Sequence, residues 1–210
     1  VDTTPNTDQI YRSDIEMVGD VSAALDALRA GIGQGARWRE AEIADHRARL
    51  DELYYAGKTP GKLNPTDVVD VTRAVMPRDT VVTTDVGSHK LLVGQGWTTY
   101  ARKGLLMSNG LSSMGYSLPA AMTAKLLMPD REIVRFTGDG GLAMVQGELR
   151  LASSLKLGMK IIVFCDNSLN RIELKQMARQ YPSSGTTIDP TNIVMLSESM
   201  DCNAFEANTI

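Results

Sequence analysis

The chain has 210 residues, of which 43% are hydrophobic, and its formal net charge is −3. A chain of this size can bury the core of one large domain, or of one and a half, and the weak negative charge argues against nucleic acid as a partner. No stretch approaches the roughly 20 consecutive apolar residues that a membrane-spanning helix needs, and the first residues lack the order of a signal peptide. The two cysteines, Cys165 and Cys202, are expected to be buried, reduced thiols in a cytoplasmic protein.

The first part of the chain is expected to be the end of one domain and a connection to the next. Asp20 is suited to cap a helix whose apolar residues have helical spacing and which stops at Gly31. One helix and a strand fragment cannot enclose a core, so residues 1–32 are interpreted as the tail of a central domain. Residues 33–63 are charge-rich at helical spacing and then rich in proline and glycine, which predicts a solvated connecting helix (37–55) and a linker.

From residue 64 to residue 210 the pattern alternates between strands and helices. The predicted strands are 80–84, 105–107, 132–136, 161–165 and 204–206. The predicted helices are 65–75, 89–95, 118–127, 145–155 and 171–181, with a further capped helix within 189–200. This alternation predicts an α/β domain, with a doubly wound, mostly parallel sheet flanked by helices and preceded by a linker helix. We expect the domain to be incomplete at its C-terminal end.

Two polar clusters directly follow neighbouring apolar strands of this predicted sheet. The turn Gly138–Gly141 (GDGG) follows one strand, and Asp166 and Asn167 follow the next. Because the carboxyl ends of parallel strands share one edge of a sheet, Asp139 and Asp166 are expected to face one crevice. Asp139 alone could merely cap the next helix. A second carboxylate at the neighbouring strand end favours a Mg²⁺ site that also holds a phosphorylated cofactor.

Three segments together resemble a known family. Gly138-Asp139-Gly140, followed by Glu148 and by a strand that ends in Asp166-Asn167, resembles the thiamine-diphosphate motif of the acetolactate synthase, pyruvate oxidase and decarboxylase superfamily. The segments TDVGSHKLL at 84–92 and SNGLSSMGYSLPAA at 108–121 resemble two further cofactor-binding segments of that family, in the family's order. The resemblance covers most of residues 64–207 and implies an acetolactate synthase-like protein with the thiamine-diphosphate-binding fold.

The resemblance implies a role for each matched residue. Mg²⁺ would be bound by the side chains of Asp139 and Asp166 and by the carbonyl oxygen of Ser168. Met114 would be the apolar wedge beneath the bent cofactor, because a flexible thioether can fill the gap between two rings. The carbonyl oxygen of Ser112 would accept a hydrogen bond from the aminopyrimidine. The diphosphate would be contacted, mostly through backbone N–H groups, by Gly87, Ser88, His89, Gly140 and Gly141. Gly138 and Asn167 are the other expected cofactor-binding residues.

Several positions carry a second interpretation. Asp166 stands where the family usually has Asn, which adds a negative charge and resembles the catabolic, flavin-independent acetolactate synthases. A register in which Asn167 is the second metal ligand stays open. His89 is interpreted as a phosphate contact or a structural residue rather than a general base. Glu148 is interpreted as structural, and Cys165 as a packing residue.

The implied reaction is the decarboxylation of a 2-keto acid, with pyruvate as the leading substrate, and addition of the remaining fragment to an acceptor to give acetolactate. The implied cofactors are thiamine diphosphate and Mg²⁺, and FAD stays open without any indication in this chain. The family's activating glutamate belongs to an N-terminal, pyrimidine-binding domain and has no match here. The implied partners are therefore a 2-keto acid, that domain from another region or chain, and a second copy in a homo-oligomer (dimer or tetramer).

This chain alone is expected to be inactive, as a fragment or as one of two subunits. Other activities of the same family remain alternatives: simple 2-keto acid decarboxylation, oxidation as in pyruvate oxidase, or acyl-CoA lyase chemistry. A non-catalytic cofactor-binding module is a further alternative. A more distant one is an unrelated α/β protein that binds Mg²⁺ and a nucleotide.

Overall fold

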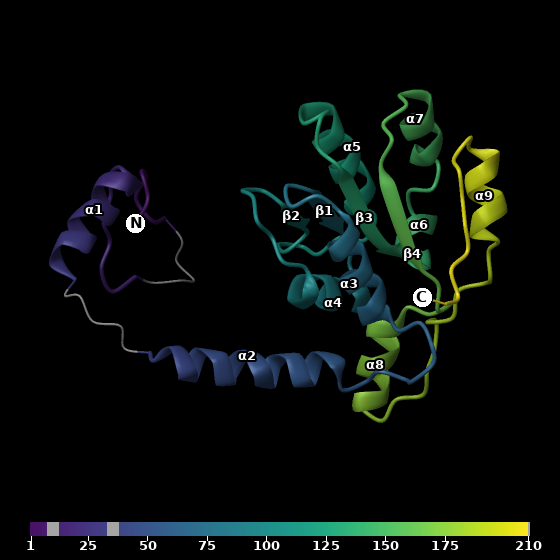
Figure 1. Ribbon diagram of the computed structural model, residues 1–210, viewed down its shortest axis with the longest axis horizontal. Coiled ribbons are helices and arrows are strands. Elements are labelled where there is room, and N and C mark those ends of the chain that lie inside the picture. Colours follow the sequence, from purple (N-terminus) through teal and green to yellow (C-terminus); the bar gives the residue numbers. More distant parts are fainter. Residues whose placement is uncertain (8–12, 33–37, 210) are drawn as a thin grey trace. The chain divides into compact units, whose positions relative to one another are not determined.

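The computed structural model describes residues 1–7, 13–32 and 38–209, which divide into two compact units, Val1–Arg49 and Leu50–Ile210. The first unit holds helix α1 (Val21–Gly31) and the first part of α2 (Glu40–Tyr55) (Figure 1). Asp20 caps α1 as expected, because its carboxylate accepts a hydrogen bond of 2.8 Å from the backbone N–H of Ala23. Part of the expected linker, residues 33–37, lies outside the described residues.

The second unit alternates strands with helices, as the sequence predicts. Its strands are β1 (Val81–Thr84), β2 (Leu105–Met107), β3 (Ile133–Gly138) and β4 (Lys160–Phe164). Its further helices are α3 (Pro65–Val75), α4 (Ser88–Gly96), α5 (Ser117–Leu127), α6 (Asp139–Ala143), α7 (Glu148–Ser154), α8 (Asn170–Ala178) and α9 (Ile193–Ser199). The helix expected at 145–155 is thus preceded by a short additional one, α6, which begins inside the glycine-rich turn. None of the described helices is both long and apolar enough to span a membrane.

The strands of this unit form one parallel sheet in the order β2-β1-β3-β4. In the register, Val82 lies opposite Leu105 on one side and Val134 on the other. From β1 the chain continues to β2 on one side of β1, and from β2 it crosses to β3 on the other side of β1. The topological switch point therefore lies between β1 and β3. Ligands of open α/β sheets bind outside the carboxyl ends of the strands at such a point.

Helices cover both faces of the sheet, which confirms the doubly wound α/β prediction (Figure 1). Val134 and Phe136 point to one face, where they pack with residues of α3 and α4. Ile133, one residue earlier, packs on the opposite face with Ala121 and Ala124 of α5. Successive side chains of a strand alternate between faces, and both faces are buried here, so Ile133 and Val134 are both apolar although they point in opposite directions.

Two predictions at the edge of the sheet are wrong. Residues 204–206, which lie in the described part of the chain, form no strand, and Phe205 is 91% exposed. A strand there would bury no other large apolar side chain, so pairing brings little gain. Cys165 is exposed rather than buried, because β4 is an edge strand and ends one residue earlier, at Phe164. Cys202 is only partly buried, and both thiols are free.

Substitution of a buried and of an exposed phenylalanine tests the position of the core. Phe136 is fully buried and contacts Trp97 edge-to-face, with ring centroids 6.0 Å apart. We expect Phe136→Ala to lower the free energy of unfolding by about 3–5 kcal/mol, because it removes a buried ring and leaves a cavity. Urea denaturation followed by circular dichroism measures the change. The matched control, Phe205→Ala, should change stability by no more than about 0.5 kcal/mol, and comparable losses in the two variants would contradict this core.

Candidate functional site

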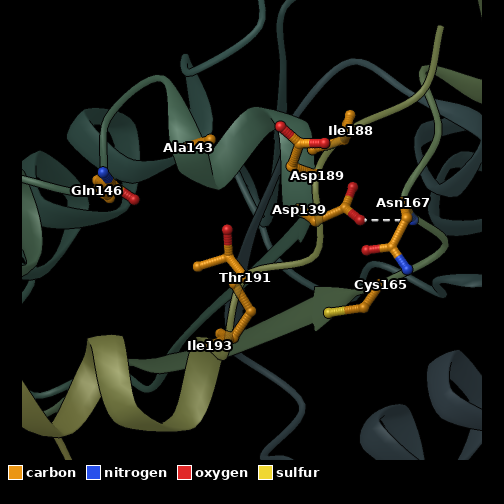
Figure 2. Close-up of a pocket in the computed structure, with 9 residues that line it drawn as sticks. All are labelled: Asp139, Ala143, Gln146, Cys165, Asn167, Ile188, Asp189, Thr191 and Ile193. Carbon is orange, nitrogen blue, oxygen red and sulfur yellow. Dashed lines mark hydrogen bonds between the residues drawn. The ribbon is translucent and has the colours of Figure 1, made fainter.

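Polar residues gather where β3 and β4 end, and they line a pocket there (Figure 2). Asp139 begins α6 directly after β3, while Cys165 and Asn167 follow β4. The opposite wall comes from the segment that leads into α9. The full set of lining residues is Asp139, Ala143, Gln146, Cys165, Asn167, Ile188, Asp189, Thr191 and Ile193.

The carboxylate of Asp139 is held by backbone N–H groups on both of its oxygens. Oδ1 accepts from the N–H of Gly140 and Oδ2 from the N–H of Asn167, each at 2.8 Å. The second bond, drawn dashed in Figure 2, joins the end of β3 to the loop after β4. It depends on the left-handed backbone of Asn167, whose φ is 55°, a conformation that Asn tolerates better than most residues. Asp139 is 92% buried by this arrangement, since its exposed fraction is 8%.

Asp166, the other expected carboxylate, lies beside the pocket rather than in its lining. Its Oδ1 accepts a hydrogen bond of 3.2 Å from the N–H of Ser168. Partial burial raises the pKa of Asp166, and the nearby negative charge of Asp139 raises it further. The hydroxyl of Ser168 donates to Glu173 at 2.6 Å. In the described part of the chain, no three His, Cys, Asp or Glu side chains are grouped closely enough to hold a metal ion.

Three apolar side chains from distant parts of the sequence converge on Gly140. A Cβ atom at this position would lie 2.9 Å from Cδ1 of Ile188, 3.2 Å from Cδ2 of Leu169 and 3.3 Å from Cε of Met114. The structure thus brings Met114, the expected wedge residue, against the glycine-rich turn. A side chain at position 140 would require the flexible ends of these three side chains to shift.

The segment 84–92 lies on the same edge and is tightly packed. A Cβ atom at Gly87 would lie only 2.5 Å from Cε1 of His89. His89 stacks on Phe164 with ring centroids 5.9 Å apart, and its Nε2 is buried with no hydrogen-bond partner among the described residues. Burial lowers the pKa of His89 to about 4, so its imidazole is neutral at pH 7. The hydroxyl of Ser88 donates to Oδ1 of Asn170 at 2.6 Å, which links α4 to α8.

Lys90 joins two of the matched segments, although the sequence analysis did not single it out. Its ammonium donates to the carbonyl oxygen of Ser108 and lies 3.5 Å from Oγ of Ser112. Ser112 has a left-handed backbone, with φ at 54°. The only hint in the sequence was the position of Lys90 directly after Gly87-Ser88-His89. Most lysines lie at the surface, so this position alone does not indicate a role in the site.

The pocket wall contributed by residues 186–193 was also not anticipated. This segment pairs with the loop after β4 through an antiparallel bridge between Ser168 and Thr187. The N–H of Ile188 donates to the carbonyl oxygen of Asn167 at 2.8 Å. From the sequence, this stretch was expected only to cap the last helix. It does so, because the side chain of Asn192 accepts a hydrogen bond from the N–H of Met195 at the start of α9. Glu148 is exposed at the start of α7, away from the pocket lining.

The neutral state of His89 predicts a dependence of stability on pH. Between its ordinary pKa of 6.5 and its lowered pKa of about 4, the unfolded chain binds a proton that the folded chain does not. The free energy of unfolding should therefore fall, by up to about 1.4 kcal/mol per pH unit, as the pH drops through this window. Urea titrations at several pH values should show a shallower decline in His89→Gln. His46→Gln, which removes the exposed histidine of α2, is the control, and an unchanged slope in His89→Gln would refute the assignment.

Comparison with known proteins identifies the family. The family described as "Thiamine pyrophosphate enzyme, C-terminal TPP binding domain" matches residues 85–210. The chain is 28% identical over 208 residues to the catabolic acetolactate synthase of Raoultella terrigena, which covers 93% of this chain and 36% of that relative. It is 35% identical over 109 residues to the acetolactate synthase isozyme 1 large subunit of Escherichia coli K12, covering 52% of this chain and 19% of the relative. The chain spans about a third of the length of the first curated relatives that it matches.

A solved structure supports the fold independently. The thiamine diphosphate-dependent 4-hydroxybenzoylformate decarboxylase of Rhodococcus jostii RHA1 superposes with a TM-score of 0.67 and 20% sequence identity, over 72% of this chain and 29% of that one. At this identity the likeness shows a shared fold. Because the family match covers more than half of the chain, the protein belongs to the thiamine pyrophosphate enzymes and carries their C-terminal TPP-binding domain.

Proposed function

We propose that this chain is the diphosphate-binding part of a thiamine diphosphate- and Mg²⁺-dependent enzyme that acts on 2-keto acids. The leading reaction is acetolactate synthase-like decarboxylation of pyruvate followed by carboligation, in keeping with the relatives' names. One observation carries the proposal. The buried Asp139 carboxylate lines a pocket together with Asn167, and Cε of Met114 lies 3.3 Å from the position that a Cβ atom of Gly140 would take. Two of the three matched segments therefore approach each other at the glycine-rich turn next to this pocket, and the third lies on the same edge.

The residues present fit a group with an anionic diphosphate and an apolar body. The apolar side-chain ends of Met114, Leu169 and Ile188 lie close to Gly140, and apolar groups of this kind suit contact with the uncharged part of such a group. The buried Nε2 of His89, which has no partner among the described residues, is suited to a hydrogen bond with a phosphate oxygen. Because no three carboxylates, thiols or imidazoles converge among the described residues, Mg²⁺ would take phosphate oxygens as part of its shell.

Each part of the site would have its own task. Asp139 and Asp166 would hold Mg²⁺ through their side chains and Ser168 through its carbonyl oxygen. Burial is the main cause of the raised pKa of Asp166, and the charge of Asp139 adds to it; a divalent cation would relieve the repulsion between the two carboxylates. Met114 would support the ring portion and keep it bent. When bound, thiamine diphosphate supplies the electron sink for decarboxylation of the 2-keto acid. Neutral His89 would orient the diphosphate, and its lowered pKa makes it a poor general base at pH 7.

The whole reaction would need more than this chain. The relatives are about three times as long, and an activating glutamate would come from a pyrimidine-binding domain in another region or another chain. We expect the 210-residue chain to bind thiamine diphosphate with Mg²⁺ but not to consume pyruvate. Calorimetry with thiamine diphosphate, ATP and NAD, each with Mg²⁺, checks the first point. Binding of a nucleotide in place of thiamine diphosphate would overturn the proposal.

The second metal ligand can be assigned by substitution. We expect Asp139→Ala and Asp166→Ala each to weaken Mn²⁺ binding in the presence of thiamine diphosphate by roughly tenfold or more, because each removes a direct carboxylate ligand. Electron paramagnetic resonance of free Mn²⁺ measures the affinity. Asn167→Ala is the matched comparison and should leave the affinity within a few fold. If Asn167→Ala abolishes binding and Asp166→Ala spares it, the ligand is Asn167, whose side chain lines the pocket.

A further inference from the structure

The centre of β3 holds a charged side chain where an apolar one would be expected. Arg135 has an exposed fraction of 0%, as does Asp85, which directly follows β1. The Nη2 of Arg135 lies 3.5 Å from Oδ2 of Asp85. Burial lowers the pKa of Arg135 only to about 10, so the guanidinium keeps its charge at neutral pH. Burying such a pair is costly, and well-packed apolar residues often serve stability as well or better. Stability alone therefore does not explain it.

The guanidinium contacts two of the three segments that resemble cofactor-binding segments, and the residue directly before the third. Its ion pair with Asp85 reaches the segment 84–92. Its Nε donates at 2.7 Å to Oγ of Ser117, in the segment 108–121 that carries Met114. Its Nη2 also donates at 3.2 Å to Oγ1 of Thr137, which directly precedes the glycine-rich turn.

This network lies directly against the backbone of the glycine-rich turn. A Cβ atom at Gly141 would lie 2.7 Å from Oγ1 of Thr137 and 2.8 Å from Oδ2 of Asp85. Thr137 donates to that same carboxylate oxygen at 3.1 Å. A shift of the Asp85 side chain would therefore be transmitted to Gly141. A second link runs through Ser117, since its carbonyl oxygen accepts at 2.9 Å from Thr83 of β1.

We propose that Arg135 is a positioning residue whose three-way contacts set the placement of the Met114 segment relative to the glycine-rich turn. The inference rests on the proposed function, because placement matters only if one ligand bridges the two segments. A planar guanidinium suits this task, since its donors are fixed in a fork and cannot be rearranged independently. The diphosphate end of the ligand would need only the turn and the metal ligands. The ring portion would also need Met114 at the correct position relative to the glycine-rich turn.

The test compares two ligands on the 210-residue chain. Calorimetry measures the affinity for thiamine diphosphate and for inorganic diphosphate, both with Mg²⁺, and the readout is the ratio of the two affinities. Loss of folded protein weakens both ligands by the same factor, because both bind only the folded chain, and leaves the ratio unchanged. We expect Arg135→Met to lower the ratio by roughly tenfold, the scale of losses when a supporting hydrogen-bond partner is removed. Arg131→Met, which removes an arginine that precedes β3 and binds Asp79, should leave the ratio unchanged.

Two further variants separate positioning from charge balance. Arg135→Met leaves Asp85 as an uncompensated buried charge. The double variant Arg135→Met with Asp85→Asn removes both charges, so its melting temperature should recover. Its affinity ratio should stay low. If the ratio recovers together with the melting temperature, Arg135 is only a charge partner and the inference fails. Arg135→Lys keeps the charge without the fork. Arg135→Lys should fold even if Arg135→Met does not, and it should also lower the ratio of the two affinities. An unchanged ratio in Arg135→Lys overturns the inference.

The wild-type result separates this inference from the proposed function. A wild-type chain that binds neither ligand overturns the proposed function, and the inference with it. A wild-type chain that prefers thiamine diphosphate, together with Arg135 variants that lose equal affinity for both ligands, overturns the inference alone. A wild-type chain with no preference between the ligands likewise removes the basis for a positioning role, although diphosphate binding would stand.

Discussion

Parallel pairing of β1 with β3, between helices on both faces, is the constraint on which the site depends. It places the carboxyl ends of both strands at one edge, so that Asp85, the glycine-rich turn and the loop after β4 become neighbours although they are far apart in the chain. Gly140 and Asn167 lie beyond the ends of β3 and β4, so their N–H groups are not paired within the parallel sheet. The N–H groups of Gly140 and Asn167 are used instead to hold the carboxylate of Asp139.

The region beneath this edge is unusually polar for the middle of a sheet. A buried ion pair between Arg135 and Asp85 and a neutral, buried His89 lie under the turn, while the apolar contacts of Met114 and Ile188 lie at Gly140. Fixed dipoles and charges in a low-dielectric environment interact more strongly than the same groups in water. An edge supported in this way is suited to hold a charged group in one orientation, which is the task of the protein in an enzyme whose cofactor supplies the chemistry.

The sequence predicted the secondary structure of the second unit well, because β1 and β3 are buried on both faces and because α3 and α9 begin at recognisable caps. It failed where burial depends on the position of a strand in the sheet. Cys165 looked buried because it follows an apolar run, but β4 lies at the edge. Residues 204–206 were expected to form a last short strand, yet they form none and Phe205 remains exposed. The contacts of Lys90 and of the 186–193 wall were not predictable, since each joins segments that are separate in sequence.

The sequence by itself determined the alternation of strands and helices, the glycine-rich turn and the positions of Asp139, Asp166 and Asn167 relative to the strand ends. These follow from local patterns of apolar residues, glycines and polar strand ends, which act over a few positions. Only the tertiary structure decided that Asn167, rather than Asp166, lines the pocket beside Asp139 and that Arg135 lies buried among three segments. Those outcomes depend on strand order and on which face a side chain occupies, and both are set by packing between elements that no local pattern encodes.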